Sequence, residues 1–451
     1  MEHWLSRAAA MHPDRVALVS APRRGFTYVE LERRALGVGR ALLAQGVSPG
    51  EHVALALGAG EELVAAVHGC MLAGAVAIPV DLRLSPAERA RRTGGARVVL
   101  DRPLPDTAAG RSDVAALPEQ AQLPDLTPLV LDQIAVVVHT SGTTAAPRPV
   151  GLTFGNWLAS ALGSAVALGL DPAERWLCPM PLVHVGGLAT AIRSAIYATT
   201  VVLHDRFDTE AVLGALMEPG QRITLVSLVP TMLSRLLEAG LRDPPTLRWA
   251  LLGGGPIAPA LLRRARDAGV PVAPSYGMSE GCSQIATHGW PLPGVEVRVA
   301  GAPRASSGEP SVGELLVRGP TIAPGALGSD GWLHTGDLGA LDARGRLTIA
   351  GRMTDTIISG GENVTPAEVE AVLLEHPAVD DAGVFGRADA EWGEMVVASV
   401  VLREGAVVGR EELRSHCAAR LARFKVPKAV LFADRLPRSH TGKLLRRELG
   451  R

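Results

Sequence analysis

Residues 134–148 read IAVVVHTSGTTAAPR, and this stretch is the best guide to the fold of the chain. Residues 134–138 form a continuous apolar run of strand length. The run leads directly into a loop of hydroxyl groups and glycine, and a cation, Arg148, follows it. Such a loop offers N–H and O–H donors to phosphate oxygens. It lacks the spacing of a Walker loop, so a polar turn before a helix is the alternative interpretation. The candidate phosphate ligands are Thr140, Ser141, Gly142, Thr143, Thr144 and Arg148.

Outward from this stretch, strand patterns alternate with helical patterns. Residues 28–43 and 61–73 have helical spacing, and residues 52–57 and 77–80 form short apolar runs. This alternation predicts a parallel α/β sheet. Further strands are expected at residues 200–203, 224–229 and 249–252, and a helix is expected with an apolar face of Trp157, Leu158, Ala161, Leu162, Ala165 and Val166.

The pattern changes near Gly351, where shorter strands begin. Thr365 and Pro366 predict a helix start, with the threonine as N-cap and Glu368 completing a capping box. We therefore expect an α/β protein with a large, multi-layer N-terminal domain and a small, mobile α+β C-terminal domain. The expected domains are residues 1–351 and 352–451. A short strand is expected at residues 346–350, just before the boundary, and further strands are expected at residues 355–358, 382–385 and 396–402 in the second domain.

Composition excludes several classes of protein. The 451 residues are 47% hydrophobic and 20% charged, which is enough to build a large core. A formal net charge of −1 gives no general attraction to nucleic acid or anionic lipid. We find neither a signal peptide nor an apolar run that would insert into a membrane, so a cytoplasmic location is expected. The cysteines, expected as free buried thiols, are Cys70, Cys178, Cys282 and Cys417.

Lysine is rare and confined to the C-terminus. The 45 basic residues include only Lys425, Lys428 and Lys443 as lysines. Lysine carries a compact charge that arginine does not reproduce, so a lysine that persists in this chain is a functional candidate. For Lys443 the alternative is a solvated charge in the terminal tail.

Other segments contain residues suited to a nucleotide. A carboxylate such as Asp337 can accept both hydroxyls of a ribose, and Arg352 can reach the same sugar or a phosphate. Glu280 can bind Mg²⁺ through its hard oxygen atoms. Tight turns and exposed charges are the structural alternatives. The remaining candidates are Gly253, Gly254, Gly255 and Pro256, then Ser275, Tyr276, Gly277, Met278 and Ser279, and finally Gly360 and Gly361.

In this order and spacing, the segments resemble the acyl-adenylate-forming (AMP-binding) superfamily over nearly the whole chain. The resemblance implies that ATP activates a carboxylic acid as its acyl-adenylate and that coenzyme A then takes the acyl group. It implies a hinge at residues 352–355. It also implies that the loop from Thr140 binds the triphosphate and that the glycine run and the Tyr276 segment bind adenine. By the same resemblance, Glu280 binds Mg²⁺, Asp337 binds the ribose, and Lys443 acts in adenylation. Gly360 and Gly361 would line the pantetheine channel.

One segment departs from the superfamily pattern. After two threonines the usual sequence is Gly-x-Pro-Lys-Gly, whereas this chain has Ala145, Ala146, Pro147, Arg148 and Pro149. Arginine keeps the charge. Loss of both glycines is expected to stiffen the loop, because proline fixes φ and removes an N–H donor.

Within the superfamily, several stretches are similar to the o-succinylbenzoate–CoA ligases of menaquinone biosynthesis. They include residues 175–188 and 275–284. That acid has two carboxylates, so its pocket needs a second anion site. Arg193 is the candidate cation, although an arginine on a helix surface is an equal alternative. The candidate substrate residues are His184, which the resemblance also places near the chemistry, Arg193, Gly277, Ser283 and Gln284.

Three alternatives stay open at this point. The chain could be a CoA ligase for another aryl or medium-chain carboxylate, a slow or non-catalytic nucleotide-binding homologue, or a module that loads a carrier protein. The oligomeric state, monomer or homodimer, has no signature in the sequence.

Overall fold

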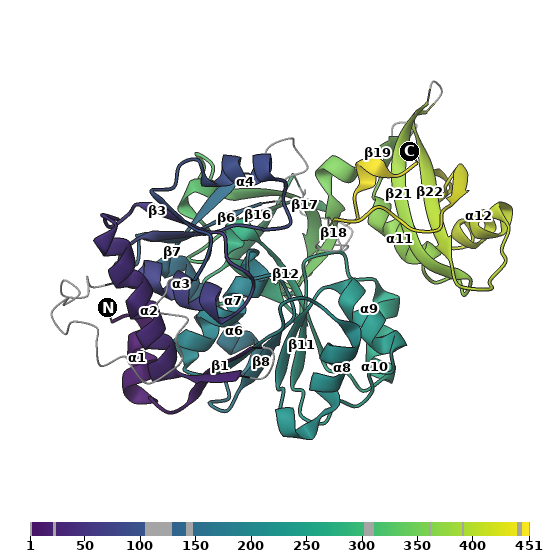
Figure 1. Ribbon diagram of the computed structural model, residues 1–451. Coiled ribbons are helices and arrows are strands. Elements are labelled where there is room, and N and C mark those ends of the chain that lie inside the picture. Colours follow the sequence, from purple (N-terminus) through teal and green to yellow (C-terminus); the bar gives the residue numbers. More distant parts are fainter. Residues whose placement is uncertain are drawn as a thin grey trace.

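The computed structural model describes residues 2–20, 24–103, 129–140, 148–301, 311–359, 362–389, 392–439 and 444–450. These residues form a large lobe and a smaller C-terminal lobe, which Figure 1 shows side by side. The predicted α/β fold, with a large N-terminal part and a separate C-terminal unit, is confirmed.

The largest sheet of the big lobe has nine strands in the order β14-β13-β12-β11-β10-β8-β9-β1-β2. The central run from β12 to β1 is parallel, and antiparallel strands flank it. All residues of β9 and β10 are buried, as expected for parallel strands covered on both faces. The strands are β1 (Val16–Ser20), β2 (Arg24–Thr27), β8 (Arg175–Cys178), β9 (Thr200–Leu203), β10 (Leu225–Leu228), β11 (Trp249–Leu252), β12 (Val272–Met278), β13 (Ser283–Thr287) and β14 (Trp290–Pro291).

A second sheet of the big lobe has the order β5-β3-β4-β6-β7. The strand predicted at residues 134–138 is β6, and it returns as the antiparallel edge strand β7. Pro149 is the first residue of β7 and pairs with His139. Proline is tolerated at the start of an edge strand, so this departure from the superfamily pattern belongs to the sheet. The strands are β3 (His52–Leu55), β4 (Val76–Pro79), β5 (Val98–Leu100), β6 (Ile134–His139) and β7 (Pro149–Thr153).

Two further sheets lead from the big lobe into the small one. An antiparallel sheet, β15-β16-β17-β18, ends at Arg352, and the short turn η5 (Met353–Asp355) connects it to the C-terminal sheet β20-β19-β22-β21 with β23 beside β22. The strands are β15 (Glu296–Ala300), β16 (Gly313–Arg318), β17 (Leu333–Leu341), β18 (Leu347–Arg352), β19 (Ile357–Ser359), β20 (Glu362–Val364), β21 (Val379–Asp389), β22 (Gly393–Leu402) and β23 (Ala429–Phe432).

Helices cover the sheets. Where a helix begins, a side-chain cap often replaces the missing backbone partners: Thr153 and Asn156 form such a capping box at the start of α6. The helices are α1 (Trp4–Met11), α2 (Tyr28–Ala44), α3 (Glu61–Leu72), α4 (Pro86–Thr93), α6 (Phe154–Leu168), α7 (Val185–Tyr197), α8 (Thr209–Met217), α9 (Pro230–Glu238), α10 (Pro259–Asp267), α11 (Pro366–Leu373) and α12 (Arg410–Ala418), and the remaining 3₁₀ turns are η2 (Pro219–Gln221), η3 (Ser279–Gly281), η4 (Pro324–Ala326), η6 (Arg423–Lys425) and η7 (Arg446–Glu448).

Two sequence predictions about helices were wrong in detail. On α6, Leu162 and Val166 are 57% and 71% exposed, whereas Ser160 is buried. The hydroxyl of Ser160 hydrogen-bonds within the protein, so a polar residue faces inward. At α11, Thr365 is the N-cap but makes no side-chain cap: the Glu368 N–H donates to the Thr365 carbonyl at 3.1 Å, and the Glu368 carboxylate pairs with Lys425 at 2.7 Å.

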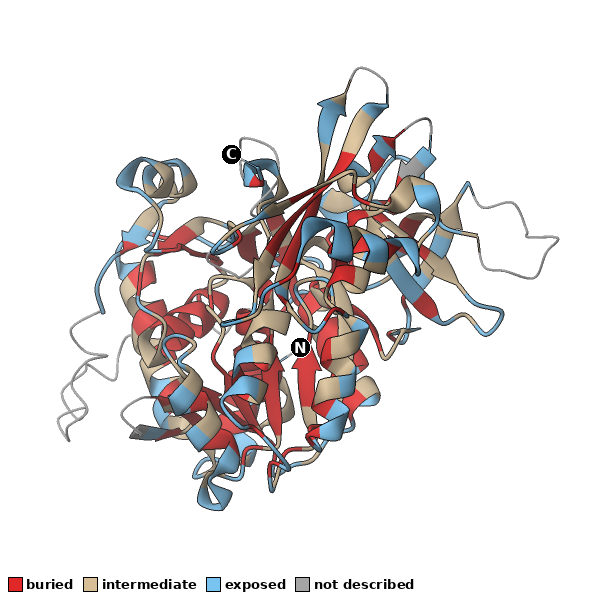
Figure 2. Cartoon of the chain, turned by 90° about the vertical axis from the view of Figure 1, so that its right-hand side faces the viewer, coloured by how far each residue is buried: buried red, intermediate tan, exposed pale blue. Residues whose placement is uncertain are grey.

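Buried residues concentrate in the central strands and the helix faces against them, as Figure 2 shows. All four cysteines are free and buried, as predicted. Among the described residues, no helix has both the length and the apolar character needed to cross a membrane.

Candidate functional site

Tyr276, Asp337 and Arg352 form one hydrogen-bonded group. The Tyr276 hydroxyl donates to Asp337 Oδ2 over 2.8 Å, and Arg352 Nε lies 2.8 Å from Asp337 Oδ1. Asp337 on β17 is the register partner of Arg352 on β18, and Tyr276 reaches them from β12 in another sheet. Burial and the Asp337 charge both raise the pKa of Tyr276, which therefore remains a hydroxyl donor. Predicted ligands far apart in sequence thus share one site.

The glycine run lies beside the Tyr276 segment. Gly253 follows β11 directly, and a Cβ there would come within 3.2 Å of the Ser275 carbonyl oxygen. Gly254 has φ of +78°, a conformation that glycine adopts without strain. Because β10, β11 and β12 are parallel, this turn and Tyr276 lie toward the same edge of the sheet, where ligands of open α/β sheets bind.

Gly277 permits a close approach between two strands. A Cβ at this position would lie 1.7 Å from the Ser283 carbonyl oxygen, so no other residue fits without a shift of the backbone. Gly277 pairs with Gln284 in β13, next to an irregularity in the register. The candidate nucleotide strand and the candidate substrate strand are therefore neighbours.

Arg193 is buried in the interior, so the alternative of a helix-surface arginine is wrong. The side chain projects from α7, is 1% exposed, and donates to Gln284 Oε1 at 2.6 Å and Ser160 Oγ at 2.7 Å. Its Nε has no partner in the described part of the chain. Burial lowers the pKa of Arg193, yet arginine remains charged at neutral pH. The structure thus holds a buried cation between neutral groups.

The other predicted substrate residues have different surroundings. Gln284 has both ends of its amide occupied, since Nε2 donates to Thr287 Oγ1 at 2.7 Å. It is therefore a partner of Arg193 rather than a free donor. Ser283 has φ of +87° and is partly exposed next to Gly277. His184 stands at the N-cap of α7.

Glu280 is partly exposed in the turn η3 that follows β12, and its backbone oxygen accepts from Ala323 at 2.8 Å. A single accessible carboxylate fits Mg²⁺, which usually keeps water and substrate phosphates as its other ligands. The described ranges contain no cluster of three or more metal-binding side chains.

Several predicted ligands lie outside the described residues: Ser141, Gly142, Thr143, Thr144, Gly360, Gly361 and Lys443. Their described neighbours are placed. Thr140 donates its N–H to the carbonyl of Arg148 at 3.0 Å, and Arg148 itself is exposed. Arg438 bridges to Leu444 on either side of residues 439–443.

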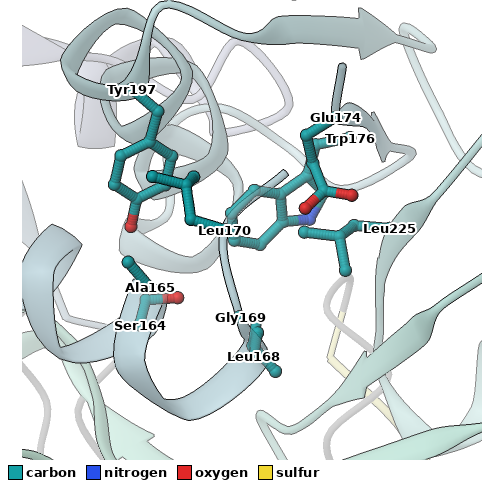
Figure 3. Close-up of a pocket in the computed structure, with 9 residues that line it drawn as sticks. All are labelled: Ser164, Ala165, Leu168, Gly169, Leu170, Glu174, Trp176, Tyr197 and Leu225. Atoms are coloured by element: carbon teal, nitrogen blue, oxygen red, sulfur yellow. The ribbon is translucent and has the colours of Figure 1, made fainter. Parts of the chain in front are cut away.

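A small cavity lies beside Trp176. It is lined by residues of α6, α7, β8 and β10 and of the segment between α6 and β8, including Ser164, Glu174 and Tyr197 (Figure 3). Its volume of about 10 Å³ has room for about one water molecule. An aryl acid would not fit there, so this cavity is not the acyl pocket.

The sequence did not reveal Ser160 as a partner of Arg193. A usable signal existed: Asn156, Ser160 and Ser164 recur every four residues along the face of α6 that is buried. Thr335 was also missed. Its hydroxyl accepts the N–H of Asp337 at 3.0 Å and so helps to hold the candidate ribose ligand.

The chain was compared with known proteins. Residues 5–327 match the AMP-binding enzyme family, and residues 368–443 match the AMP-binding enzyme C-terminal domain. The 2-succinylbenzoate–CoA ligase of Bacillus licheniformis is 40% identical, with 100% of both chains covered. The enzyme of the same name from Bacillus subtilis is 38% identical over 99% of this chain and 97% of that protein.

Solved structures agree. The o-succinylbenzoate CoA synthetase of Bacillus subtilis in complex with its acyl-adenylate intermediate has a TM-score of 0.87 at 38% identity, covering 100% of this chain and 98% of that one. The same enzyme with ATP and magnesium has a TM-score of 0.86 at 37% identity, covering 100% and 99%. Together with the two family matches, these likenesses span the whole chain, which belongs to the AMP-binding enzyme family.

Proposed function

We propose that this chain is a 2-succinylbenzoate–CoA ligase. It uses ATP to convert the acid into its acyl-adenylate, releases pyrophosphate, and then transfers the acyl group to coenzyme A with release of AMP. The two relatives that have this name match the chain over nearly the full length of both proteins. Free thiols throughout are in keeping with a cytoplasmic location.

The β12–β13 pairing is the observation that carries the proposal. Tyr276, next to Gly277, hydrogen-bonds to Asp337, and Gln284, the register partner of Gly277, hydrogen-bonds to Arg193. One hairpin therefore joins a group suited to a nucleotide to a buried cation suited to an acid. An enzyme that makes an acyl-adenylate needs this adjacency, because its two substrates must meet at one phosphorus atom.

Arg193 is the reason for proposing a dicarboxylic acid as the substrate. A buried guanidinium is costly unless a charge compensates it. No ion pair joins Arg193 to a carboxylate in the part of the chain that the structure describes, and its Nε is unpartnered. The carboxylate of 2-succinylbenzoate that does not react would provide the missing charge. Ser283, partly exposed nearby, is the proposed additional donor, and His184 the proposed residue at the mouth of the pocket.

We propose that the following groups hold the nucleotide. Asp337 accepts the ribose hydroxyls, Arg352 adds its charge, and the backbone at Gly253 and Gly277 lets the adenine ring approach. Thr140 and Arg148 frame the triphosphate loop. Mg²⁺ bound through Glu280 would neutralise phosphate charge. No protein nucleophile is needed, because the work is positioning and charge stabilisation.

The reaction needs two arrangements of the lobes, and we propose that the chain turns about residues 352–355, with domains 1–351 and 352–451. Lys443 then bridges acid and phosphate during adenylation, and the Gly360–Gly361 loop replaces it for thioester formation. A double mutant of the Bacillus subtilis enzyme bound to a product analogue has a TM-score of only 0.69 at the same 38% identity as the acyl-adenylate complex, which scores 0.87. The present chain is arranged as in the acyl-adenylate complex.

ATP–pyrophosphate exchange over a panel of acids tests the proposal. The panel contains 2-succinylbenzoate, 4-oxo-4-phenylbutanoate without the second carboxylate, benzoate and octanoate, and thioester formation with coenzyme A is followed by mass spectrometry. We expect exchange and thioester with 2-succinylbenzoate and little with the others. Exchange with a different acid would refute the assigned specificity, and exchange with none would refute the ligase.

A further inference from the structure

Asp337 lies in a bulge of β17. Across the β16–β17 pair, Glu314 is the partner of Leu338 and Leu316 is the partner of His334. Three residues of β17, 335–337, therefore face the single residue 315 of β16. Such a bulge interrupts the ladder of backbone hydrogen bonds and redirects side chains, and bulges are common beside active sites. Asp337 is the last residue of this bulge, and its carboxylate accepts from Tyr276 of another sheet at 2.8 Å.

Side chains replace the lost backbone bonds. Gly336, with φ of +66°, donates its N–H to Glu314 Oε1 at 3.1 Å. Thr335 donates its hydroxyl to the carbonyl of Leu315 at 2.7 Å and accepts the N–H of Asp337 at 3.0 Å. The Glu314 carboxylate thus fixes the Thr335–Gly336 peptide, and the Thr335 hydroxyl fixes the next peptide, which leads into Asp337. An unmade backbone bond at this point would cost free energy and leave the turn free to relax.

A second contact orients Glu314. Its Oε2 lies 3.3 Å from His334 Nδ1, and His334 Nε2 lies 3.2 Å from Asp330 Oδ2. These two carboxylates raise the pKa of His334 and so favour its charged form. The glutamate side chain is 19% exposed, compared with 60% for Glu296 on the neighbouring strand β15. Glu314 is therefore held at both oxygens.

We propose that Glu314 is a positioning residue for the nucleotide: it holds the bulge of residues 335–337 in the shape that presents Asp337 to the ribose hydroxyls. The inference rests on the proposed role of Asp337, but it does not depend on which acid is the substrate. Glu314 acts through Gly336 and has no contact with the nucleotide in this scheme.

Equilibrium titration with MgATP and with Mg-2′,3′-dideoxy-ATP tests the inference, because neither nucleotide reacts without an acid. Removing the carboxylate in Glu314→Ala should weaken ATP binding about 10-fold, as expected for loss of a hydrogen bond to a charged group. The same variant should bind dideoxy-ATP as the wild type does, since that ligand has no hydroxyl for Asp337. Glu314→Gln, whose amide oxygen can still accept from Gly336, should recover most of the affinity.

Two further variants make the experiment decisive. Glu314→Asp keeps the charge but is too short to reach Gly336, so it should show the same selective loss of ATP binding, and it replaces Glu314→Ala as the test if the alanine variant does not fold. Glu296→Ala, which removes the exposed pair with Arg318 in the same sheet, is the matched control and should bind both nucleotides normally. Equal loss for ATP and dideoxy-ATP, or no loss for either, would overturn the inference. Wild-type protein that discriminates the two nucleotides but shows no exchange with any acid would instead refute only the proposed ligase.

Discussion

Asp337 and Arg193 are both buried charges, but the protein treats them in opposite ways. Asp337 is 5% exposed and receives donors at both oxygens, one of them from the Arg352 guanidinium. Arg193 is 1% exposed and has only neutral partners among the described residues. A charge that the protein has already paired can be held in shape before a ligand arrives. A charge without a counterion is stabilised by the ligand that supplies one.

The largest expected effect lies outside this pair, at a charge on the C-terminal lobe. Lys443→Ala should reduce ATP–pyrophosphate exchange on the order of 1000-fold, because a cation that stabilises the developing charge is lost. Thioester formation from supplied acyl-adenylate should change little, since in the proposed scheme the lysine leaves the site before that step. Stopped-flow measurement of each half-reaction tests this. Equal losses in both halves would show that Lys443 does not act at one step.

Arg193→Met should give the next largest effect, and it tests the buried charge that has no counterion among the described residues. We expect the KM for 2-succinylbenzoate to rise about 100-fold, as when one partner of a buried charge pair is removed. For 4-oxo-4-phenylbutanoate, which lacks the second carboxylate, the variant should equal the wild type. Thermal stability should not fall, because an uncompensated charge leaves the core. If both acids suffer alike, Arg193 is structural.

Asp337→Asn tests the buried charge that the protein pairs with Arg352. The amide keeps one acceptor but loses the charge shared with Arg352, so ATP affinity should fall about 30-fold while the KM for the acid is unchanged. Titration with MgATP and exchange at saturating ATP separate the two effects. A rise in the acid's KM of similar size would contradict the assignment of Asp337 to the nucleotide.

His68 adds a third case to the comparison of Asp337 with Arg193, because it is an ionisable group that is buried in its neutral form. It is 3% exposed, and burial lowers its pKa to about 4, so the protein holds it neutral. A basic group whose pKa is lower in the folded protein does not reduce the free energy of unfolding while the pH is above its unfolded pKa, near 6.5. The free energy of unfolding falls as the pH decreases from 6.5 through 4. At pH 5.5 the expected loss is about 1 kcal/mol. The wild type should therefore lose about 2 °C more in its unfolding midpoint between pH 7.5 and 5.5 than His68→Leu does. Identical pH dependence in both proteins would contradict this.

The sequence was sufficient to predict most of the fold. The apolar run at residues 134–138 became β6, and the predicted strand at residues 249–252 became β11. Period and turn chemistry are local, so they can be seen in one chain. The same logic was wrong for α6, where Leu162 and Val166 are exposed. The apolar pattern is interrupted because Ser160 of α6 is buried as a hydrogen-bond partner of Arg193, which lies 33 residues away in the sequence.

The candidate site was predictable as a set of residues, but its geometry was not. Asp337 and Tyr276 were both expected to contact the nucleotide, yet their mutual hydrogen bond joins residues 61 positions apart. The link between Arg193 and Gln284 spans 91 positions. The bulge at Asp337 depends on the register between two strands. The residues next to Glu314 in the sequence do not indicate that register. Such long-range pairing is decided by packing.

One isotope experiment tests the central claim, that the acid attacks the α-phosphate of ATP. The enzyme is given 2-succinylbenzoate with ¹⁸O in both carboxylates, together with MgATP and coenzyme A, and the products are examined by mass spectrometry. We expect AMP that contains one ¹⁸O atom, transferred when the thiol displaces the adenylate, and unlabelled pyrophosphate. Thioester formed with unlabelled AMP, or with the label in inorganic phosphate, would contradict it.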